Sequence, residues 1–373
     1  MGLAARPRWA ILLHMNRLPL PPALRRSLLV VAKFLVPVAI IAWLIWSVEA
    51  EQWEELRSQK TDVPVLLGAL GIALGALTIS FVRWGLLVRC QGIPLSMIEA
   101  FRLGAIGFLL SFVSAGSVGG DLFKAIFLAR RSPGKRVEAV ASVFVDRGSG
   151  LFGLLLIASV ALLLAPPVDE VQDRERLRQL GQGAAVLMTI GVIGTAVLVL
   201  GGRPIDRLIQ SCARWRWIGP SLARLAQPLR AFHRHPWGFA ISVVLSVLVQ
   251  SLFAVSVFLV AVGLYGGRGS VPGLAEHFLI VPVGMLASAL PIAPAGLGLF
   301  EAAIEWGYGV VPTEPTRASG TLVALVFEFV KLLLAILGVL FYWTAGRDVQ
   351  QSIAATEQEA EESSARAAKP FIG

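Results

Sequence analysis

Charged residues are scarce in this chain of 373 residues. Asp, Glu, Lys and Arg together make up 15% of it, whereas 56% of the residues are hydrophobic, and the mean hydropathy is +0.73. A water-soluble domain cannot hide that much apolar surface, whereas a polytopic helical membrane protein requires it. The composition therefore excludes a soluble globular protein and predicts an all-α protein that crosses a membrane several times.

The residues that usually bind metals or act as nucleophiles are also scarce. The chain has two cysteines and four histidines. Cys90 and Cys212 both fall in arginine-rich stretches that we predict to face the cytoplasm, which argues against a disulfide. The motifs DxD, HExxH and GxSxG do not occur. The sequence therefore predicts no metal site, no cofactor and no catalytic site.

Acidic residues are absent from residues 1–26, which carry five arginines. The formal net charge of +9 could suggest a nucleic-acid partner, but the arginines lie between long apolar runs, where positive charge marks the cytoplasmic side of a membrane. We therefore expect no nucleic-acid partner. We predict a basic cytoplasmic N-terminus at 1–26, a transmembrane domain at 27–345 and a disordered, acidic cytoplasmic tail at 346–373.

Six apolar runs are long enough to span a bilayer, which takes about 17–25 residues. The first run is too long for the apolar core of a signal peptide. The loop at 203–236 contains seven arginines and one acid; this suits either an amphipathic helix on an anionic leaflet or a loop that topology alone makes basic. The six predicted spans are 27–48, 63–88, 138–164, 183–200, 237–264 and 317–343.

Two further apolar segments are interrupted by residues that break helices. The first runs from Met97 to about Arg131 and precedes a basic stretch that ends at Arg136. The second covers 279–310. Lipid cannot satisfy the backbone groups that such interruptions release, so each break must lie inside protein or beside a water-filled cavity. The interrupting residues are Ser114, Gly116, Ser117, Gly119 and Gly120 in the first segment, and Pro282, Pro291, Pro294, Gly296 and Gly298 in the second.

The two halves of the chain repeat one order of elements. Repeat 1 (27–165) and repeat 2 (183–345) each read as span, span, broken hairpin and span. Gly116 precedes Asp121 by five residues, and Gly296 precedes Glu301 by five. By the topology count the two hairpins enter from opposite sides. The pattern predicts six full transmembrane helices plus two re-entrant broken hairpins, arranged as an inverted repeat with a binding site near the middle of the membrane.

The helix that follows each break is expected to point free amides and its positive dipole end toward the break, which favours an anion there. Ionisable residues at membrane depth usually line a pathway or pair with one another. Three alternatives stay open: Asp121 and Glu301 cap their helices, Arg147 makes a structural pair with one of them, and Glu328 pairs with Lys331 on one helix face. The candidate substrate-binding residues are Gly116, Gly119, Gly120, Asp121, Lys124, Asp146, Arg147, Gly296, Gly298 and Glu301, with Glu328 and Lys331 as further candidates.

Three stretches resemble motifs of one family. They read SAGSVGGDLFKAIFLAR, SVFVDRGSG and APAGLGLFEAAI, in that order along the chain. They are similar to the Gly-Gly-Asp, Ser-Val-x-x-Glu/Asp-Arg and Pro-Gly-Gly-x-Gly-x-x-Glu signatures of the lysylphosphatidylglycerol synthase transmembrane family, over roughly residues 25–345. This chain departs from the family pattern by carrying Ala115 in place of proline, Lys124 in place of arginine and Ala295 in place of glycine.

The resemblance implies a flippase-like domain in a cell membrane, which we expect to be the bacterial inner membrane. Only 346–373 follow the last predicted span, so we expect no aminoacyl-transferase domain. The expected cargo is a membrane lipid, either an anionic or zwitterionic phospholipid or a polyprenyl-phosphate. Two alternatives are an integral-membrane transferase acting on a lipid-linked substrate and a non-transporting partner of a separate lipid-modifying enzyme.

Overall fold

The computed structural model describes six stretches of the chain, and all their regular secondary structure is α-helical. Four of the described helices are long and apolar enough to cross a membrane: α3 (Val63–Cys90), α6 (Arg136–Leu164), α10 (Pro236–Tyr265) and α13 (Gly320–Trp343). Four are shorter: α4 (Met97–Val113), α5 (Gly119–Arg131), α11 (Leu274–Ser288) and α12 (Leu299–Val310). The described residues are 61–113, 119–164, 234–266, 271–289, 298–312 and 318–344, with Trp46, Glu54, Gln182, Thr189 and Thr316.

Four of the six predicted spans are confirmed as long helices. α3, α6 and α10 begin and end within two residues of the predicted bounds. α13 begins at Gly320, three residues later than predicted, because the side chain of Ser319 accepts a hydrogen bond from the backbone N–H of Leu322 and caps the helix. Apart from Trp46 and Thr189, the predicted spans 27–48 and 183–200 lie outside the described residues, as do the tail and the loop at 203–236 except for its end.

Both interrupted segments fold as two helices with a break between them. The first break separates α4 from α5, and the second separates α11 from α12. The prediction that Pro282 interrupts the second segment is wrong, because Pro282 lies inside α11, which begins at Leu274 rather than at 279. A proline in an apolar helix removes one backbone hydrogen bond, and packing of neighbouring helices makes this tolerable. Pro282 is buried in this way.

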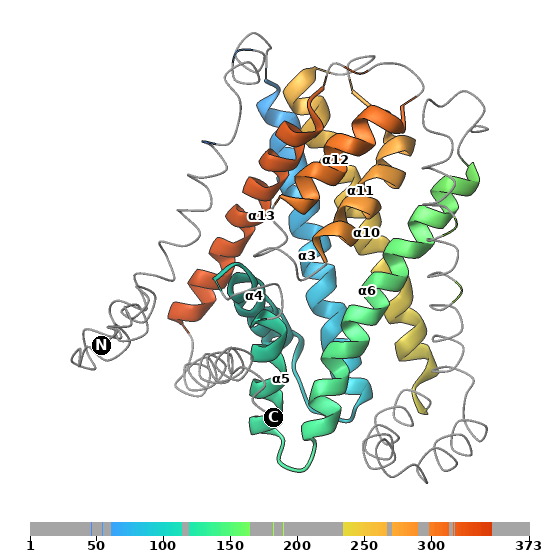
Figure 1. Ribbon diagram of the computed structural model, residues 1–373. Coiled ribbons are helices and arrows are strands. Elements are labelled where there is room, and N and C mark those ends of the chain that lie inside the picture. Colours follow the sequence, from blue (N-terminus) through green and yellow to red (C-terminus); the bar gives the residue numbers. More distant parts are fainter. Residues whose placement is uncertain are drawn as a thin grey trace, which may run out of the picture.

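Two of the long helices, α3 and α10, pack side by side along the centre of the bundle, as Figure 1 shows. The α4–α5 pair lies in the lower half of that view and the α11–α12 pair in the upper half. Each pair also contacts the long helix of the other half of the chain, because α4 packs on α13 and α11 packs on α6. The apolar core follows this division: one cluster joins α3, α10, α11, α12 and α13, and a second joins α3, α4, α5 and α6.

Glycines allow the helices of the first pair to touch through their backbones. A Cβ atom on Gly120 of α5 would lie 1.9 Å from the carbonyl oxygen of Gly107 and 2.5 Å from the hydroxyl of Ser111, both on α4. Small residues are the usual means of such close approach between membrane helices. The α4–α13 crossing is similar, since a Cβ on Gly338 would lie 2.4 Å from the carbonyl oxygen of Ala105.

Replacing Gly120 by alanine is expected to separate α4 from α5 and to lower the free energy of unfolding by about 1–3 kcal/mol, because the clash involves backbone that cannot rotate away. Gly148→Ala is the matched control, since nothing lies within 4 Å of a Cβ at that position of α6. Thermal unfolding of the purified variants in detergent measures the difference. Equal unfolding midpoints for the two variants would contradict the backbone contact.

Candidate functional site

Asp121 is the third residue of α5, directly after the first break. Its Oδ1 atom lies 3.3 Å from Nζ of Lys124, one turn further along the same helix. The Nε–H of Arg147 on α6 donates to Oδ2 of the same carboxylate. The aspartate therefore holds two cations from two helices. The structural pair of Arg147 with Asp121, one of the predicted alternatives, is therefore formed.

A second aspartate extends this group of charges into the bundle. Oδ2 of Asp146, on α6, lies 3.9 Å from Nζ of Lys124. Its Oδ1 accepts a 2.9 Å hydrogen bond from Nε of Arg83 on α3, and the same guanidinium donates to Ser246 on α10, also at 2.9 Å. Arg83, Asp121, Lys124, Asp146 and Arg147 together form what we call the first charge cluster.

Sequence reasoning missed Arg83 as a member of this site. Near the cytoplasmic end of the predicted span 63–88 an arginine is expected as a topology signal, but the side chain of Arg83 is only 6% exposed. The signal that could have found it is its position inside the span, since an arginine at membrane depth requires a partner. The partner itself could not be found in this way, because Asp146 lies 63 residues away in the sequence.

The first charge cluster carries more positive than negative groups. Its ion pairs join three cations to two carboxylates, so these five described side chains carry a formal charge of +1. Nζ of Lys124 also lies 5.0 Å from the centre of the Trp84 ring, on α3, a favourable cation–π arrangement. The side chain of Arg147 is 55% exposed, whereas the side chain of Asp121 is 13% exposed. The cluster is therefore accessible at Arg147 and closed at its inner end.

The second break has acidic residues beside it. Glu301 is the third residue of α12, as Asp121 is of α5. Its Oε2 atom accepts a 2.7 Å hydrogen bond from the backbone N–H of Gly298, so Glu301 caps its helix, whereas Asp121 forms ion pairs. Gly298 has a φ of +85°, a left-handed conformation that favours glycine.

Glu328 and Lys331 on α13 pair at 2.5 Å, as predicted. Glu301, Glu328 and Lys331 form the second charge cluster.

A buried histidine joins the helices of the second pair, and sequence reasoning did not identify it. His277 on α11 is fully buried. Its Nδ1 lies 2.9 Å from the carbonyl oxygen of Gly273, and its Nε2 lies 2.8 Å from the hydroxyl of Tyr308 on α12. A carbonyl can only accept, so Nδ1 carries the proton and Nε2 accepts from the tyrosine. The two residues are 31 positions apart, and no local motif marks the pair.

The other predicted site residues are placed as follows. Gly116 and Gly296 lie in the two breaks, outside the described residues. Gly119 is the first residue of α5, and Gly120 lies against α4, where its small size serves helix packing. The structure thus groups Asp121 and Lys124 with Asp146 and Arg147 on α5 and α6, and it places Glu301 with Glu328 and Lys331 on α12 and α13.

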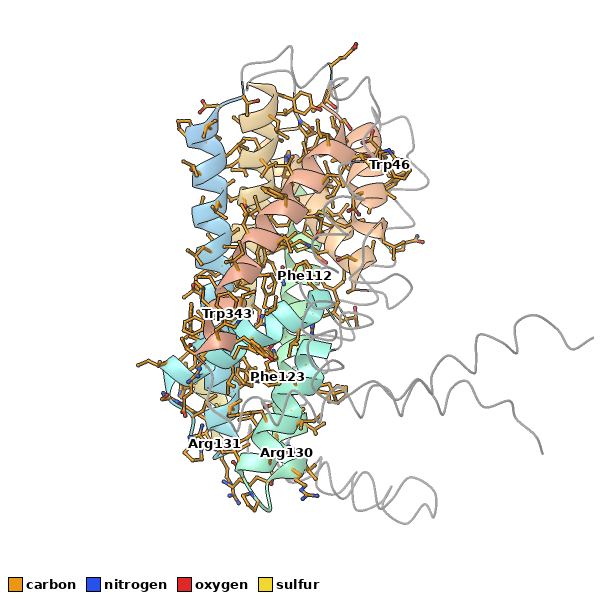
Figure 2. All side chains as sticks on the ribbon, turned by 90° about the vertical axis from the view of Figure 1, so that its left-hand side faces the viewer. Trp46, Phe112, Phe123, Arg130, Arg131 and Trp343 are labelled. Atoms are coloured by element: carbon orange, nitrogen blue, oxygen red, sulfur yellow. The ribbon has the colours of Figure 1, made fainter. Side chains whose placement is uncertain are left out.

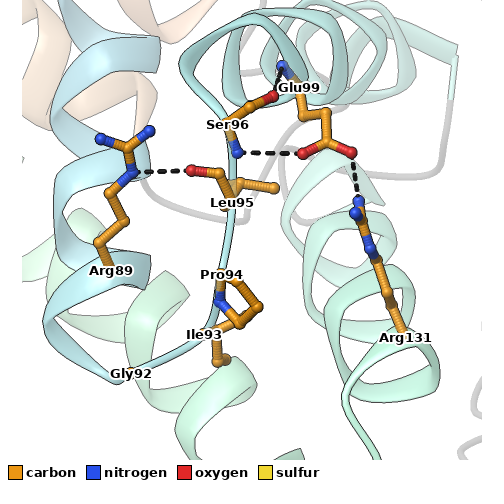
Figure 3. Close-up of a pocket in the computed structure, with 8 residues that line it drawn as sticks. All are labelled: Arg89, Gly92, Ile93, Pro94, Leu95, Ser96, Glu99 and Arg131. Atoms are coloured by element: carbon orange, nitrogen blue, oxygen red, sulfur yellow. Dashed lines mark hydrogen bonds and ion pairs between the residues drawn. The ribbon is translucent and has the colours of Figure 1, made fainter.

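An open pocket of about 710 Å³ lies where α3 ends and α4 begins, shown in Figure 3. Nε of Arg89 donates to the carbonyl oxygen of Leu95 at 2.7 Å, and Arg131 pairs with Glu99 at 2.5 Å. The backbone N–H of Ser96 donates to the Glu99 carboxylate and holds the pKa of Glu99 below its usual range. Figure 2 places Arg130 and Arg131 at the lower end of the molecule. These contacts fix the start of α4 against the end of α5.

Long apolar helices, two interrupted helix pairs and ion pairs inside the bundle define an integral membrane protein. The chain belongs to the family described as lysylphosphatidylglycerol synthase TM region, whose model matches residues 30–338. This confirms the resemblance that the three sequence motifs indicated, and it associates the protein with lipid modification at a membrane. The comparison with curated proteins finds no match, and the comparison with solved structures finds none.

Proposed function

We propose that this protein is a lipid translocator that moves a phospholipid, or another lipid with a phosphate-bearing headgroup, across the bacterial inner membrane. The observation that carries the proposal is the first charge cluster, which has an excess positive charge beside the break before α5. We also propose that the protein performs no chemical reaction on the lipid. Its termini would both face the cytoplasm.

The first charge cluster has the chemistry that a phosphate requires. A guanidinium can bind two phosphate oxygens at once, and a lysine adds a compact charge. Arg147, which is the more exposed of the two residues in its pair with Asp121, is positioned to meet the headgroup first. Lys124, 13% exposed, lies deeper. The start of α5, directly after the break, offers backbone amides that also favour an anion.

The proposed route across the membrane is an inverted repeat of six full spans and two re-entrant hairpins, which rock against one another around the site. Helix packing supports this repeat. The contacts α3–α4, α4–α5, α5–α6 and α3–α6 have the counterparts α10–α11, α11–α12, α12–α13 and α10–α13. The exchanged contacts α4–α13 and α11–α6 correspond in the same way. The placement of the two short helix pairs in opposite halves of the bundle (Figure 1) supports the inversion.

Native mass spectrometry of the purified protein tests the proposal. We expect the wild type to retain a lipid that carries phosphate, and Arg147→Ala to lose most of it, because the alanine removes the accessible guanidinium. Arg131→Ala is the matched control, since Arg131 makes an exposed ion pair outside the first charge cluster. Retention of the same lipid by Arg147→Ala and by the control would count against a phosphate site at this cluster.

A further inference from the structure

The second charge cluster differs from the first in the sign of its formal charge, because its described residues include two carboxylates and one lysine. We propose that Glu301 and Glu328 hold one exchangeable proton between them, and that uptake and release of this proton is coupled to lipid movement. The coupling rests on the translocator function proposed above, whereas the proton site stands on its own geometry.

Glu301 lies in a buried environment. The residue is 5% exposed. Its Oε2 atom is engaged by the N–H of Gly298, but its Oε1 atom is buried and has no hydrogen-bond partner among the described residues. A buried carboxylate oxygen without a donor is costly to an ionised group. A proton on this oxygen converts it from an unsatisfied acceptor into a hydroxyl that can donate.

The described lysine that could neutralise Glu301 is Lys331 on α13. Nζ of Lys331 lies 2.5 Å from Oε1 of Glu328. It also lies 5.2 Å from the ring centre of Phe300 and 5.5 Å from that of Phe327, so it is held between Glu328 and two buried rings. Phe300 directly precedes Glu301 in α12, so the contact of Lys331 with the Phe300 ring places the Glu328–Lys331 pair beside Glu301. With all three groups ionised, one negative charge remains buried, and a single proton cancels it.

The other titratable and charged groups on α12, and on the helices α11 and α13 that pack against it, have partners of their own. On α11, His277 is engaged by Tyr308 and Gly273, and the Glu276 carboxylate accepts from the N–H of Gly273. On α12, Glu305 accepts from the N–H of Thr321 at the start of α13. Glu328 and Lys331 are the charged residues within α13. None of these described groups offers Glu301 a second cation.

The proposed step is a simple proton exchange. One oxygen of the Glu301–Glu328 pair takes a proton from water on one side of the membrane and becomes a carboxylic acid, and the cluster becomes neutral. After the two halves rock, the acid gives the same proton to water on the other side. A neutral cluster costs less free energy in the apolar interior than a charged one while the two halves rock. Protonation would therefore permit the movement that carries the headgroup.

Infrared difference spectra of the purified full chain, recorded between acidic and alkaline pH, test the proton site. We expect the wild type to show the carbonyl stretch of a protonated carboxylic acid, which shifts in heavy water. Glu301→Gln should lose this band. Glu305→Gln is the matched control and should keep it, because Glu305 is an exposed residue of the same helix. A band that is absent from the wild type, or that persists unchanged in both Glu301→Gln and Glu328→Gln, overturns the proton site.

Liposomes with fluorescent phosphatidylglycerol test the coupling. A pH gradient should accelerate lipid movement by the wild type and by Glu305→Gln, but not by Glu301→Gln. Acceleration by a sodium gradient instead, or movement that ignores the pH gradient, overturns the coupling and leaves the translocator function standing. If no lipid moves under any condition, the translocator function and the coupling both fail, and the infrared band still decides on the proton site.

Discussion

Replacing Asp121 by alanine is expected to abolish headgroup movement while leaving the protein folded. Asp121 holds Lys124 and Arg147 at the start of α5 through its two carboxylate oxygens. Without it, the two cations repel one another and lose the geometry in which both can contact a phosphate. Loss of fluorescent phosphatidylglycerol movement in liposomes, with an unchanged size-exclusion profile and circular dichroism spectrum, is the expected measurement.

The matched control for Asp121→Ala is Glu99→Ala. Glu99 is also a carboxylate in the first turn of a short helix and also pairs with an arginine. Its side chain is 36% exposed, however, whereas that of Asp121 is 13% exposed, and its partner Arg131 lies outside the first charge cluster. Exposed pairs contribute about 0–1 kcal/mol, so this variant should fold and move lipid at the wild-type rate. Wild-type movement by Asp121→Ala would refute the role of the first charge cluster in transport.

The second large effect is expected for stability. Arg83→Met removes the guanidinium that pairs with Asp146 and leaves a carboxylate that is 8% exposed without its closest cation. Lys124 remains 3.9 Å away and compensates only in part. Breaking a buried pair from one side typically costs about 3–5 kcal/mol. Unfolding of the detergent-solubilised protein by heat or by denaturing detergent should show a loss of this size.

Two further variants distinguish the effect of breaking the ion pair from the effect of losing the packing of the arginine side chain. Arg83→Met combined with Asp146→Asn removes both charges and should recover a large part of the lost stability, because the buried carboxylate is gone. Arg131→Met breaks an exposed pair and should cost no more than about 1 kcal/mol. A loss in Arg83→Met that only equals the loss in Arg131→Met would contradict the importance of the buried pair.

The helices and their interruptions were predictable because their signals are local. Apolar runs predicted α3, α6, α10 and α13 within a few residues, and clustered glycines and prolines predicted the breaks before Asp121 and Glu301. The error at Pro282 has the same origin. Proline lowers the local preference for a helix, but the packing of α11 against α6, α10 and α12 is a property of the assembled bundle that a local pattern does not contain.

The ion pairs were predictable only where both partners lie on one helix face. Glu328 and Lys331, three positions apart, are such a case, and so are Asp121 and Lys124. For the structural pair of Arg147 the sequence left two partners open, Asp121 and Glu301. His277 and Tyr308 carried no signal, because a single histidine near the end of an apolar segment has many structural explanations.

The sequence by itself determined that this chain enters a membrane, where its described helices run, and which two places carry ionisable residues beside a break. These properties depend on the cost of moving each side chain and each unsatisfied backbone group from water into lipid. That cost is set by the local sequence. Only the tertiary structure decided which charges meet. Arg83 reaches Asp146 across 63 residues and Ser246 across 163, and such pairs depend on helix packing rather than on spacing.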